Sequence, residues 1–173
     1  RDRMLGTISE EDTKYVLFLR DEIRGGVLTL GGYNHPPGIS LEIVRSKTKV
    51  EPVLVDGEVE IRVKTHTTTF IDEAQENMVD FLSAKGRVEL EQRMEEKMVK
   101  EMEKVIQIAQ KQYQQDIFGF GNQIHKKFPK LWKRLEPDWD EHFSRLKVTV
   151  QADVLIKGTA STKHSLKMEE EIR

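Results

Sequence analysis

The sequence predicts an α+β fold in which a curved, mostly antiparallel sheet is backed by one long amphipathic helix and several short helices. Three patterns carry this prediction. Apolar and polar residues alternate through residues 39–70, on both sides of Asp56-Gly57, which is typical of a β-hairpin. Apolar residues recur every three or four positions over residues 90–113, as on one face of a helix. A second alternation, over residues 146–157, predicts a further strand.

The composition sets the size of the protein and excludes several classes of function. A chain of 173 residues suits one domain that buries roughly 70% of its unfolded surface. Lys and Arg number 28 against 30 Asp and Glu, so no overall field favours nucleic acid. The absence of cysteine excludes disulfides, thiolate nucleophiles and cysteine-type zinc sites. No apolar run approaches the roughly 20 residues that cross a bilayer, so we expect this stretch of chain to be soluble.

The organisation of the chain is predicted to be simple. It begins at Arg1 without a basic and apolar leader, and we therefore expect it to be a piece of a longer protein. Within it we expect one α+β domain over residues 1–158. A polar tail over residues 159–173 should be frayed, or should open an acidic helix.

The first elements are marked by a capping pattern and by turn formers. Ser9, with Asp12 three residues later, predicts a helix from about Glu10 to Glu22. The apolar run over residues 15–19 also suits a buried strand, and that alternative stays open. We expect short strands at residues 3–8 and 27–30, and a loop at residues 33–38.

The hairpin is the clearest strand pattern in the sequence. Its second arm should bury one face and expose the other; the inward set is Val59, Ile61, Val63, Thr65, Thr67 and Thr69. Pro52, in the first arm, has no N–H group for the ladder, which predicts an edge position or a bulge. A short helix is expected over residues 72–81.

A long amphipathic helix is predicted after Gly86. Its apolar stripe is made by Leu90, Met94, Met98, Met102, Val105, Ile106, Ala109 and Tyr113. We interpret the methionines as core filling, with an adaptable partner groove as the alternative. Between residues 85 and 104, six basic and six acidic residues predict a solvated, self-neutralised outer face.

Residues 116–143 carry most of the aromatic residues and predict short helices that plug a core. Pro129 suits the first turn of a new helix. Trp139 opens a second short amphipathic stretch, and Asp138 is placed to cap it. The last strand follows and should end at Gly158.

No enzyme template fits the sequence. The five histidines lack metal-ligand spacing, and the run Asp138, Asp140, Glu141 and His142 would point in different directions on a helix. A Walker loop, a dinucleotide fingerprint and a GxSxG motif are absent. The sequence therefore predicts no catalytic residue, no cofactor and no metal site.

One local asymmetry of charge remains, between His125 and Leu135. Five bases occur there without an acid, interleaved with Phe128, Leu131 and Trp132; they are Lys126, Lys127, Lys130, Lys133 and Arg134. This composition suits a helix with wet lysines and buried rings, and it also suits contact with an anionic lipid surface. Nucleic acid is not expected as a partner, because four acids follow at once and cancel the field.

The stretch Gln112–Gly121, followed by Phe128-Pro129, Trp132, Trp139 and Phe143, resembles the C-terminal domain of the Ger(x)C spore germination lipoproteins. These are the C subunits of nutrient germinant receptors. The similarity covers nearly the whole chain. The residues that match the family motif, which we interpret as architectural, are Asp116, Phe118, Gly119, Phe120, Gly121, Pro129, Trp132, Trp139, Phe143 and Gly158.

The resemblance implies a non-enzymatic subunit at the outer face of the spore inner membrane. Its partners would be membrane-embedded A and B type receptor subunits, and its lipid anchor would be an N-terminal cysteine that this chain lacks. We expect a protein-interaction module that uses the basic aromatic residues Lys126–Arg134, which we call the basic segment, or the wet sheet face with Arg62, Lys64 and His66.

Two alternative functions are weighed against the interaction module. The first is a small-molecule binding domain, in which Phe118, Phe120, Trp132 or Trp139 lines a cleft for a germinant. The second, a hydrolase of spore material, would need converging acidic or histidine groups, and no spacing in the sequence favours it.

Overall fold

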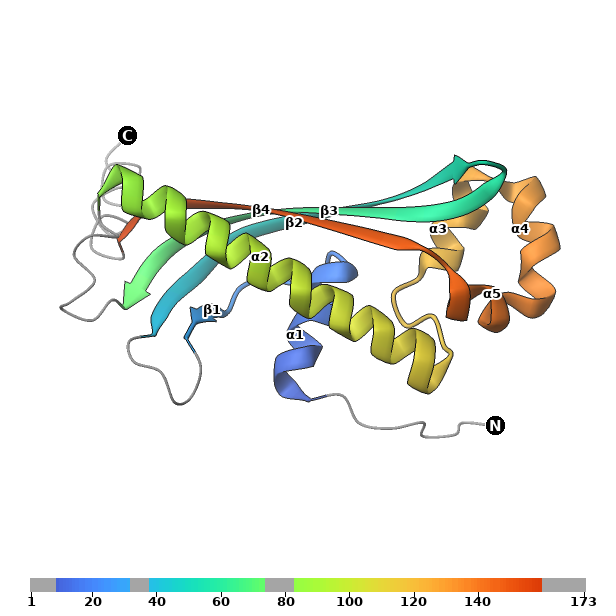
Figure 1. Cartoon of the computed structure of the whole chain (residues 1–173), viewed down its shortest axis with the longest axis horizontal. Coiled ribbons are helices and arrows are strands. Elements are labelled where there is room, and N and C mark those ends of the chain that lie inside the picture. Colours follow the sequence, from blue (N-terminus) through green and yellow to red (C-terminus); the bar gives the residue numbers. More distant parts are fainter. Residues whose placement is uncertain (1–8, 32–37, 74–82, 160–173) are drawn as a thin grey trace. The chain divides into compact units, whose positions relative to one another are not determined.

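The computed structural model describes residues 9–31, 38–73 and 83–159, which contain one four-stranded sheet in the order β1-β2-β3-β4 (Figure 1). Its strands are β1 (Val27–Leu30), β2 (Ile39–Val55), β3 (Glu58–Glu73) and β4 (Val148–Thr159). The helices are α1 (Glu10–Leu19), α2 (Ala84–Ile108), α3 (Phe120–Lys127), α4 (Pro129–Leu135) and α5 (Trp139–Arg145). A π-helical segment (Ala109–Tyr113) extends α2, and a 3₁₀ turn (Glu136–Asp138) precedes α5. The predicted α+β class, with one long helix, is confirmed.

The sheet is mixed, with two antiparallel pairs and one parallel pair. β1 runs antiparallel to β2, with Val27 opposite Glu42. The Asp56-Gly57 turn has φ of 51° and 85°, the positive values that a two-residue hairpin needs. β4 runs parallel to β3, because the Ile61 N–H donates to the carbonyl of Lys147 while the Thr149 hydroxyl donates to the carbonyl of Ile61. The helices between β3 and β4 carry the chain back along the sheet, so that β4 starts at the same end as β3.

The capping pattern before α1 forms as predicted, and the helix alternative for residues 15–19 is confirmed. The Ser9 hydroxyl accepts the Asp12 N–H at 3.0 Å and donates to the Asp12 carboxylate at 2.8 Å. The helix ends at Leu19, before the predicted Glu22, because Asp21 adopts a left-handed conformation with φ of 58°.

Several expectations fall partly or wholly on residues outside the described ranges. They are the strand at 3–8, the loop over 33–37, residues 74–81 of the expected short helix, and the tail from residue 160. The start of that helix was wrongly predicted: Asp72 and Glu73 are the last residues of β3, which continues through the buried Ile71.

The described residues group into two compact units, to which β2, β3, β4 and α2 each contribute a part. Unit 1 contains the described parts of residues 1–22, 48–65 and 98–151, and unit 2 those of residues 23–47, 66–97 and 152–173. Assignment of residues 1–158 to a single domain stays a prediction.

Unit 1 is built on the second half of the helical stripe. Its buried apolar residues include Met98, Met102, Val105, Ile106, Ala109, Tyr15, Phe18 and Leu19. Lys104 of α2 donates to the Asp12 carboxylate of α1 at 2.7 Å, and this hydrogen bond lowers the pKa of Asp12. Tyr113, the last residue of the predicted stripe, is only half-buried.

Unit 2 buries the first half of the same stripe. Its core includes Leu90 and Met94 of α2 together with Leu28, Ile39, Leu41, Ile43, Phe70, Ile71, Val154 and Ile156. Hydroxyl groups inside this part of the sheet are satisfied, because Ser46 and Thr67 lie 3.0 Å apart and Thr69 donates to the carbonyl of Leu155. Lys97 of α2 donates to the carbonyl of Thr29 at 2.7 Å.

Carboxylates of α2 cover the outer edge of β4 in unit 2. The N–H groups of Val154 and Ile156 donate to Glu95 at 2.9 Å and to Glu91 at 2.8 Å. An edge strand with free N–H groups is a template for pairing with another chain. The two glutamates therefore occupy the positions that a foreign strand would use.

The outer edge of β2 in unit 1 is closed in a similar way. β1 pairs only with Ile39–Glu42, so the later part of β2 is an edge. The Thr48 N–H donates to the Asp21 carboxylate at 2.7 Å. Pro52 lies four residues after Thr48, so its backbone nitrogen also faces the outer edge of β2. The missing N–H group of proline therefore removes no hydrogen bond from the sheet. The predicted edge position of Pro52 is confirmed.

We predict that the double substitution Glu91→Ala/Glu95→Ala opens the β4 edge. Amide hydrogen exchange at Val154 and Ile156 should become much faster, and the free energy of unfolding should fall by about 1–3 kcal/mol, because two charged hydrogen bonds are lost. Glu96→Ala/Glu103→Ala, on exposed positions of the same helix, serves as the control. Unchanged exchange at the two β4 amides would show that the carboxylates do not protect the edge.

Candidate functional site

A single carboxylate organises the loop between the long helix and α3. Asp116 Oδ1 accepts the N–H groups of Phe118, Gly119 and Phe120 at 3.1, 2.9 and 3.1 Å. Its Oδ2 accepts the Gly121 N–H at 2.7 Å and the indole N–H of Trp139 at 3.2 Å. The first N–H groups of a helix have no partner within it, and here one side chain outside the helix supplies partners for them. The same side chain ties α3 to α5.

Two glycines make this loop possible for different reasons. Gly119 has a φ of 78°, in the left-handed region that favours glycine. Gly121 has no room for a side chain, because a Cβ atom there would lie 2.7 Å from the Trp132 ring and 3.0 Å from the Trp139 ring. The two indoles meet edge to face, with their centroids 5.1 Å apart. Gly121 is therefore the contact point for both tryptophans.

The phenylalanines of the motif form a solid cluster. Phe118, Phe120 and Phe143 are buried, and their ring centroids lie 5.1 to 6.4 Å apart. Trp139 packs on Phe143 at 6.2 Å. Phe118, although buried, borders a shallow hollow beside Asp116 and Asn122, whereas Phe120 is fully buried and Trp132 and Trp139 are half-buried.

Other motif positions have simpler outcomes. Pro129 lies in the first turn of α4, as predicted. Asp138 occupies the N-cap position of α5, but its side chain makes no capping hydrogen bond, so the predicted cap is wrong; the turn before it already has helical geometry. Gly158 lies one residue before the end of β4 rather than after it, because the strand continues to Thr159.

Gln110, in the π-helical segment, has a role that the sequence did not reveal. Its buried amide donates to the carbonyls of Phe143 at 2.9 Å and Leu146 at 2.7 Å, at the end of α5. The Lys111 ammonium donates to the carbonyl of Ser144 nearby. The only hint in the sequence is that Gln110, a polar residue, directly follows Ala109 of the apolar stripe.

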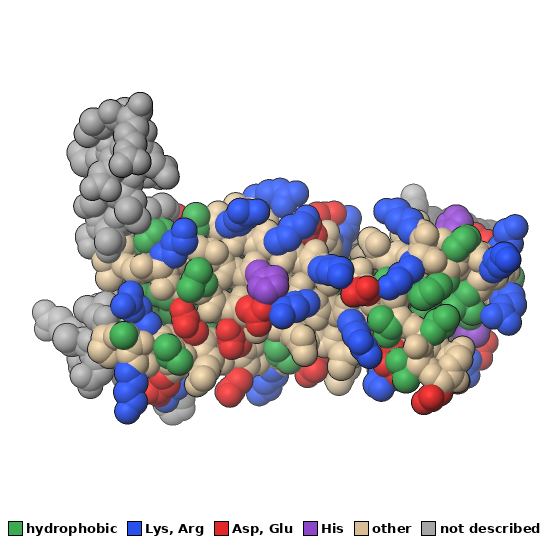
Figure 2. Space-filling model, turned by 90° about the horizontal axis from the view of Figure 1, so that it is seen from above, with side chains coloured by type: hydrophobic (Ala, Val, Ile, Leu, Met, Phe, Trp, Pro, Cys, Tyr) green, Lys and Arg blue, Asp and Glu red, His purple; other side chains and the backbone are tan. Residues whose placement is uncertain are grey.

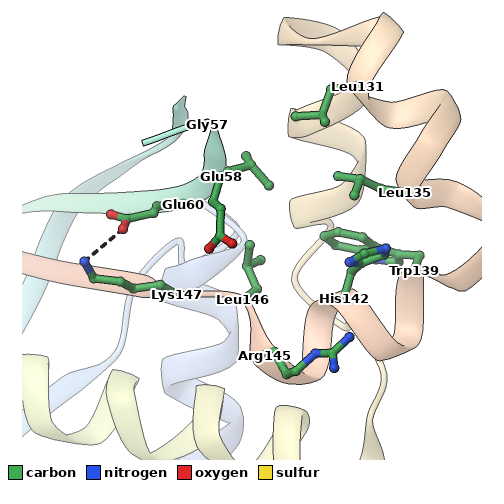
Figure 3. A pocket seen from close by; sticks show the side chains of 11 residues that line it. Gly57, Glu58, Glu60, Leu131, Leu135, Trp139, His142, Arg145, Leu146 and Lys147 are labelled. Atoms are coloured by element: carbon green, nitrogen blue, oxygen red, sulfur yellow. Dashed lines mark hydrogen bonds and ion pairs between the residues drawn. The ribbon is translucent and has the colours of Figure 1, made fainter. Parts of the chain in front are cut away.

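A cleft of about 480 Å³ opens between the hairpin end, the start of β4 and helices α4 and α5 (Figure 3). Its lining residues are Gly57, Glu58, Val59, Glu60, Leu131, Leu135, Trp139, His142, Arg145, Leu146 and Lys147. The Glu60 carboxylate already pairs with Lys147 at 2.9 Å, and Arg145 pairs with Glu141 at 3.0 Å. Of the four rings proposed for a cleft, Trp139 alone lines this one.

A second hollow of similar volume lies on the outer sheet face of unit 1, and we call it the basic groove. It is lined by Lys49, Glu51, Glu60, Arg62, Val63, Lys64, Lys147, Thr149 and Gln151. Glu51 pairs with Lys127 of α3 at 3.0 Å and with Lys49 at 3.1 Å, and these hydrogen bonds lower the pKa of its carboxyl. Figure 2 shows Lys and Arg side chains on the molecular face seen from above, interspersed with Asp and Glu side chains.

The predicted surface residues are only partly brought together. Arg62 and Lys64 line the basic groove, and Lys127 reaches it through Glu51. Lys126, Lys130, Lys133 and Arg134 are exposed on α3 and α4 and do not line it. His66 belongs to unit 2, where it faces Asp153 at 2.9 Å.

Within residues 9–31, 38–73 and 83–159, no three His, Asp or Glu side chains are placed to hold a metal ion. None of the helices in these ranges has both the length and the apolar character needed to cross a bilayer.

Comparisons with known proteins agree with the fold and the motif. A family model described as "Spore germination B3/ GerAC like, C-terminal" matches residues 1–160. In Bacillus subtilis (strain 168), spore germination protein B3 is 27% identical over 143 residues, which cover 83% of this chain and 38% of that protein. Spore germination protein YndF is 26% identical over 162 residues, which cover 92% of this chain and 40% of that protein. The chain thus spans about 40% of the length of these relatives.

A solved structure shares the same architecture. The crystal structure of the GerBC protein superimposes with a TM-score of 0.78 at 26% sequence identity. The match covers 88% of this chain and 47% of that one. This chain therefore shares its fold with the GerBC protein.

We predict that Gly121→Ala displaces both indoles, because the new methyl group would overlap them. The free energy of unfolding should fall by about 1–3 kcal/mol. The sequence contains two tryptophans, and both touch this glycine, so intrinsic fluorescence reports on the site directly. Asn122→Ala, at an exposed position of the same helix, is the control. A variant with unchanged emission and stability would show that the packing at Gly121 is loose.

Proposed function

The chain belongs to the spore germination B3/GerAC-like C-terminal domain family, and from this premise we propose that it is a domain of the C subunit of a spore nutrient germinant receptor. In this proposal the domain is not an enzyme. It acts during germination as a protein-interaction module at the outer face of the spore inner membrane. Its partners are the membrane-embedded A and B type subunits, and a lipid anchor elsewhere in the complete protein holds it at the membrane.

The observation that supports this proposal most directly is that the family motif is used in packing. The Asp116 carboxylate accepts five hydrogen bonds within the chain, and Gly121 is covered by two indoles. Phe118, Phe120 and Phe143 are buried. The motif residues thus stabilise the fold of this region. In this proposal, the partner subunits bind to the exposed surface around them.

The basic segment of α3 and α4 can contribute through charge. Trp132 packs on Gly121, Trp139 and His125 and is only half exposed, so this ring is not free to enter a bilayer. The exposed Lys126, Lys130, Lys133 and Arg134 remain able to face anionic headgroups. We include such lipid contact in the proposal as an electrostatic one.

A second candidate function is the binding of a small nutrient molecule in the cleft beside α4 and α5. Its volume of about 480 Å³ lies within the usual range of ligand sites, and Leu131, Leu135 and Trp139 give it an apolar wall. Fewer observations favour this function, because two of its charged groups, Glu60 and Lys147, already pair with each other.

We predict that photo-crosslinking from the proposed surface captures receptor subunits. A photoreactive residue would replace Arg62 or Lys130 in the complete protein, within cells that make the whole receptor. Crosslinks to the membrane-embedded subunits are expected at one or both positions, because Arg62 lies in the basic groove and Lys130 in the basic segment, the two surfaces proposed for interaction. Glu103, which is exposed on α2 in the same unit, is the control position and should give little product. Equal yields at all three positions, or none, would contradict an interaction surface on this side.

A further inference from the structure

The charges of the basic groove are arranged by the strand register. Thr48 and Thr65 share a side-chain hydrogen bond of 3.0 Å, and Asp56-Gly57 alone separates β2 from β3. This register places Lys49 opposite Lys64 and Glu51 opposite Arg62 on the outer face. On the other side of β3, Glu60 pairs with Lys147 of β4. Three strands therefore supply the charges of a single hollow.

The acids of the groove are already neutralised by its own bases and by α3. Glu51 is held by Lys49 and Lys127, and Glu60 is held by Lys147. Four bases and two acids line the groove. Among the residues that the structure describes, Arg62 makes no ion pair, and Lys49 stands directly opposite another lysine. Like charges opposite each other in a sheet destabilise it, so a bound anion would reduce the repulsion between the bases of the groove.

The spacing of these bases and the hollow that they line limit the kind of molecule that can bind here. Arg62 and Lys64 are two residues apart on one strand, so their side chains leave the sheet about 7 Å apart. An extended peptide with an acid at every second position repeats the same distance. The bases line a hollow, whereas a bilayer is broad and would rest on the rim. We propose that the basic groove binds an extended acidic segment of a partner protein; this inference rests on the interaction role proposed above.

Binding of a defined acidic peptide tests the inference. The probe is a fluorescein-labelled (Asp-Ser)5 peptide, titrated by anisotropy with the complete protein that carries this chain, and (Asn-Ser)5 is the neutral control. We expect Arg62→Glu/Lys64→Glu to weaken binding at least tenfold, and Arg62→Gln/Lys64→Gln to weaken it less. The matched control Lys100→Glu/Lys157→Glu reverses two exposed charges outside both the groove and the basic segment and should change the affinity less than threefold. Higher salt should weaken binding by the wild type.

The possible outcomes separate this inference from the proposed function. Equal peptide binding by wild type and Arg62→Glu/Lys64→Glu would overturn the inference. So would binding to phosphatidylglycerol vesicles, lost in that variant, without binding to the peptide, because the occupant would then be lipid. Crosslinks from Arg62 to receptor subunits together with no peptide binding would reject the acidic segment alone. Absence of both crosslinks and peptide binding would reject the interaction role as well.

Discussion

The carboxylate of Asp116 is the constraint on which the C-terminal part of unit 1 depends. The chain leaves the long helix at Gln114, in a left-handed conformation, and must start α3 within six residues. Four backbone N–H groups and one indole N–H converge on this single side chain. Hydrogen bonds to a charged acceptor contribute about 1.5–3 kcal/mol each when they are protected from water. The loop, α3 and α5 are therefore fixed together by one residue, and the rings pack around that frame.

Much of the fold follows from patterns that are local in sequence. The alternation about Asp56-Gly57 and the stripe from Leu90 to Ala109 predicted the hairpin and the long helix, because burial imposes the periods of strand and helix directly. Contacts between distant side chains have no such period. Glu91 and Glu95 look like solvated acids in the sequence, yet they cover the β4 edge. The five bonds of Asp116 likewise depend on a loop conformation that residue type alone does not specify.

The same distinction governs the candidate sites. The motif residues could be named from the sequence, but the burial of Phe118 and Phe120, against the exposure of Arg62 and Lys64, needed the structure. The edge of β2 at Thr48 is capped by Asp21, as the β4 edge is by the glutamates of α2. The described sheet is thus closed at these points to strand addition, while its outer face carries a positively charged hollow. This arrangement favours recognition through side chains on a face rather than through a strand edge.

The most direct test of this account is a double-mutant cycle between Asp116 and Trp139. Asp116→Asn, Trp139→Phe and the double variant would be compared with wild type by chemical unfolding of the complete protein. If the carboxylate ties α5 to the loop through the indole N–H, the two substitutions should couple by about 1–2 kcal/mol. Additive effects, with a coupling below about 0.3 kcal/mol, would show that α5 is held by ring packing alone and would contradict the central role given to Asp116.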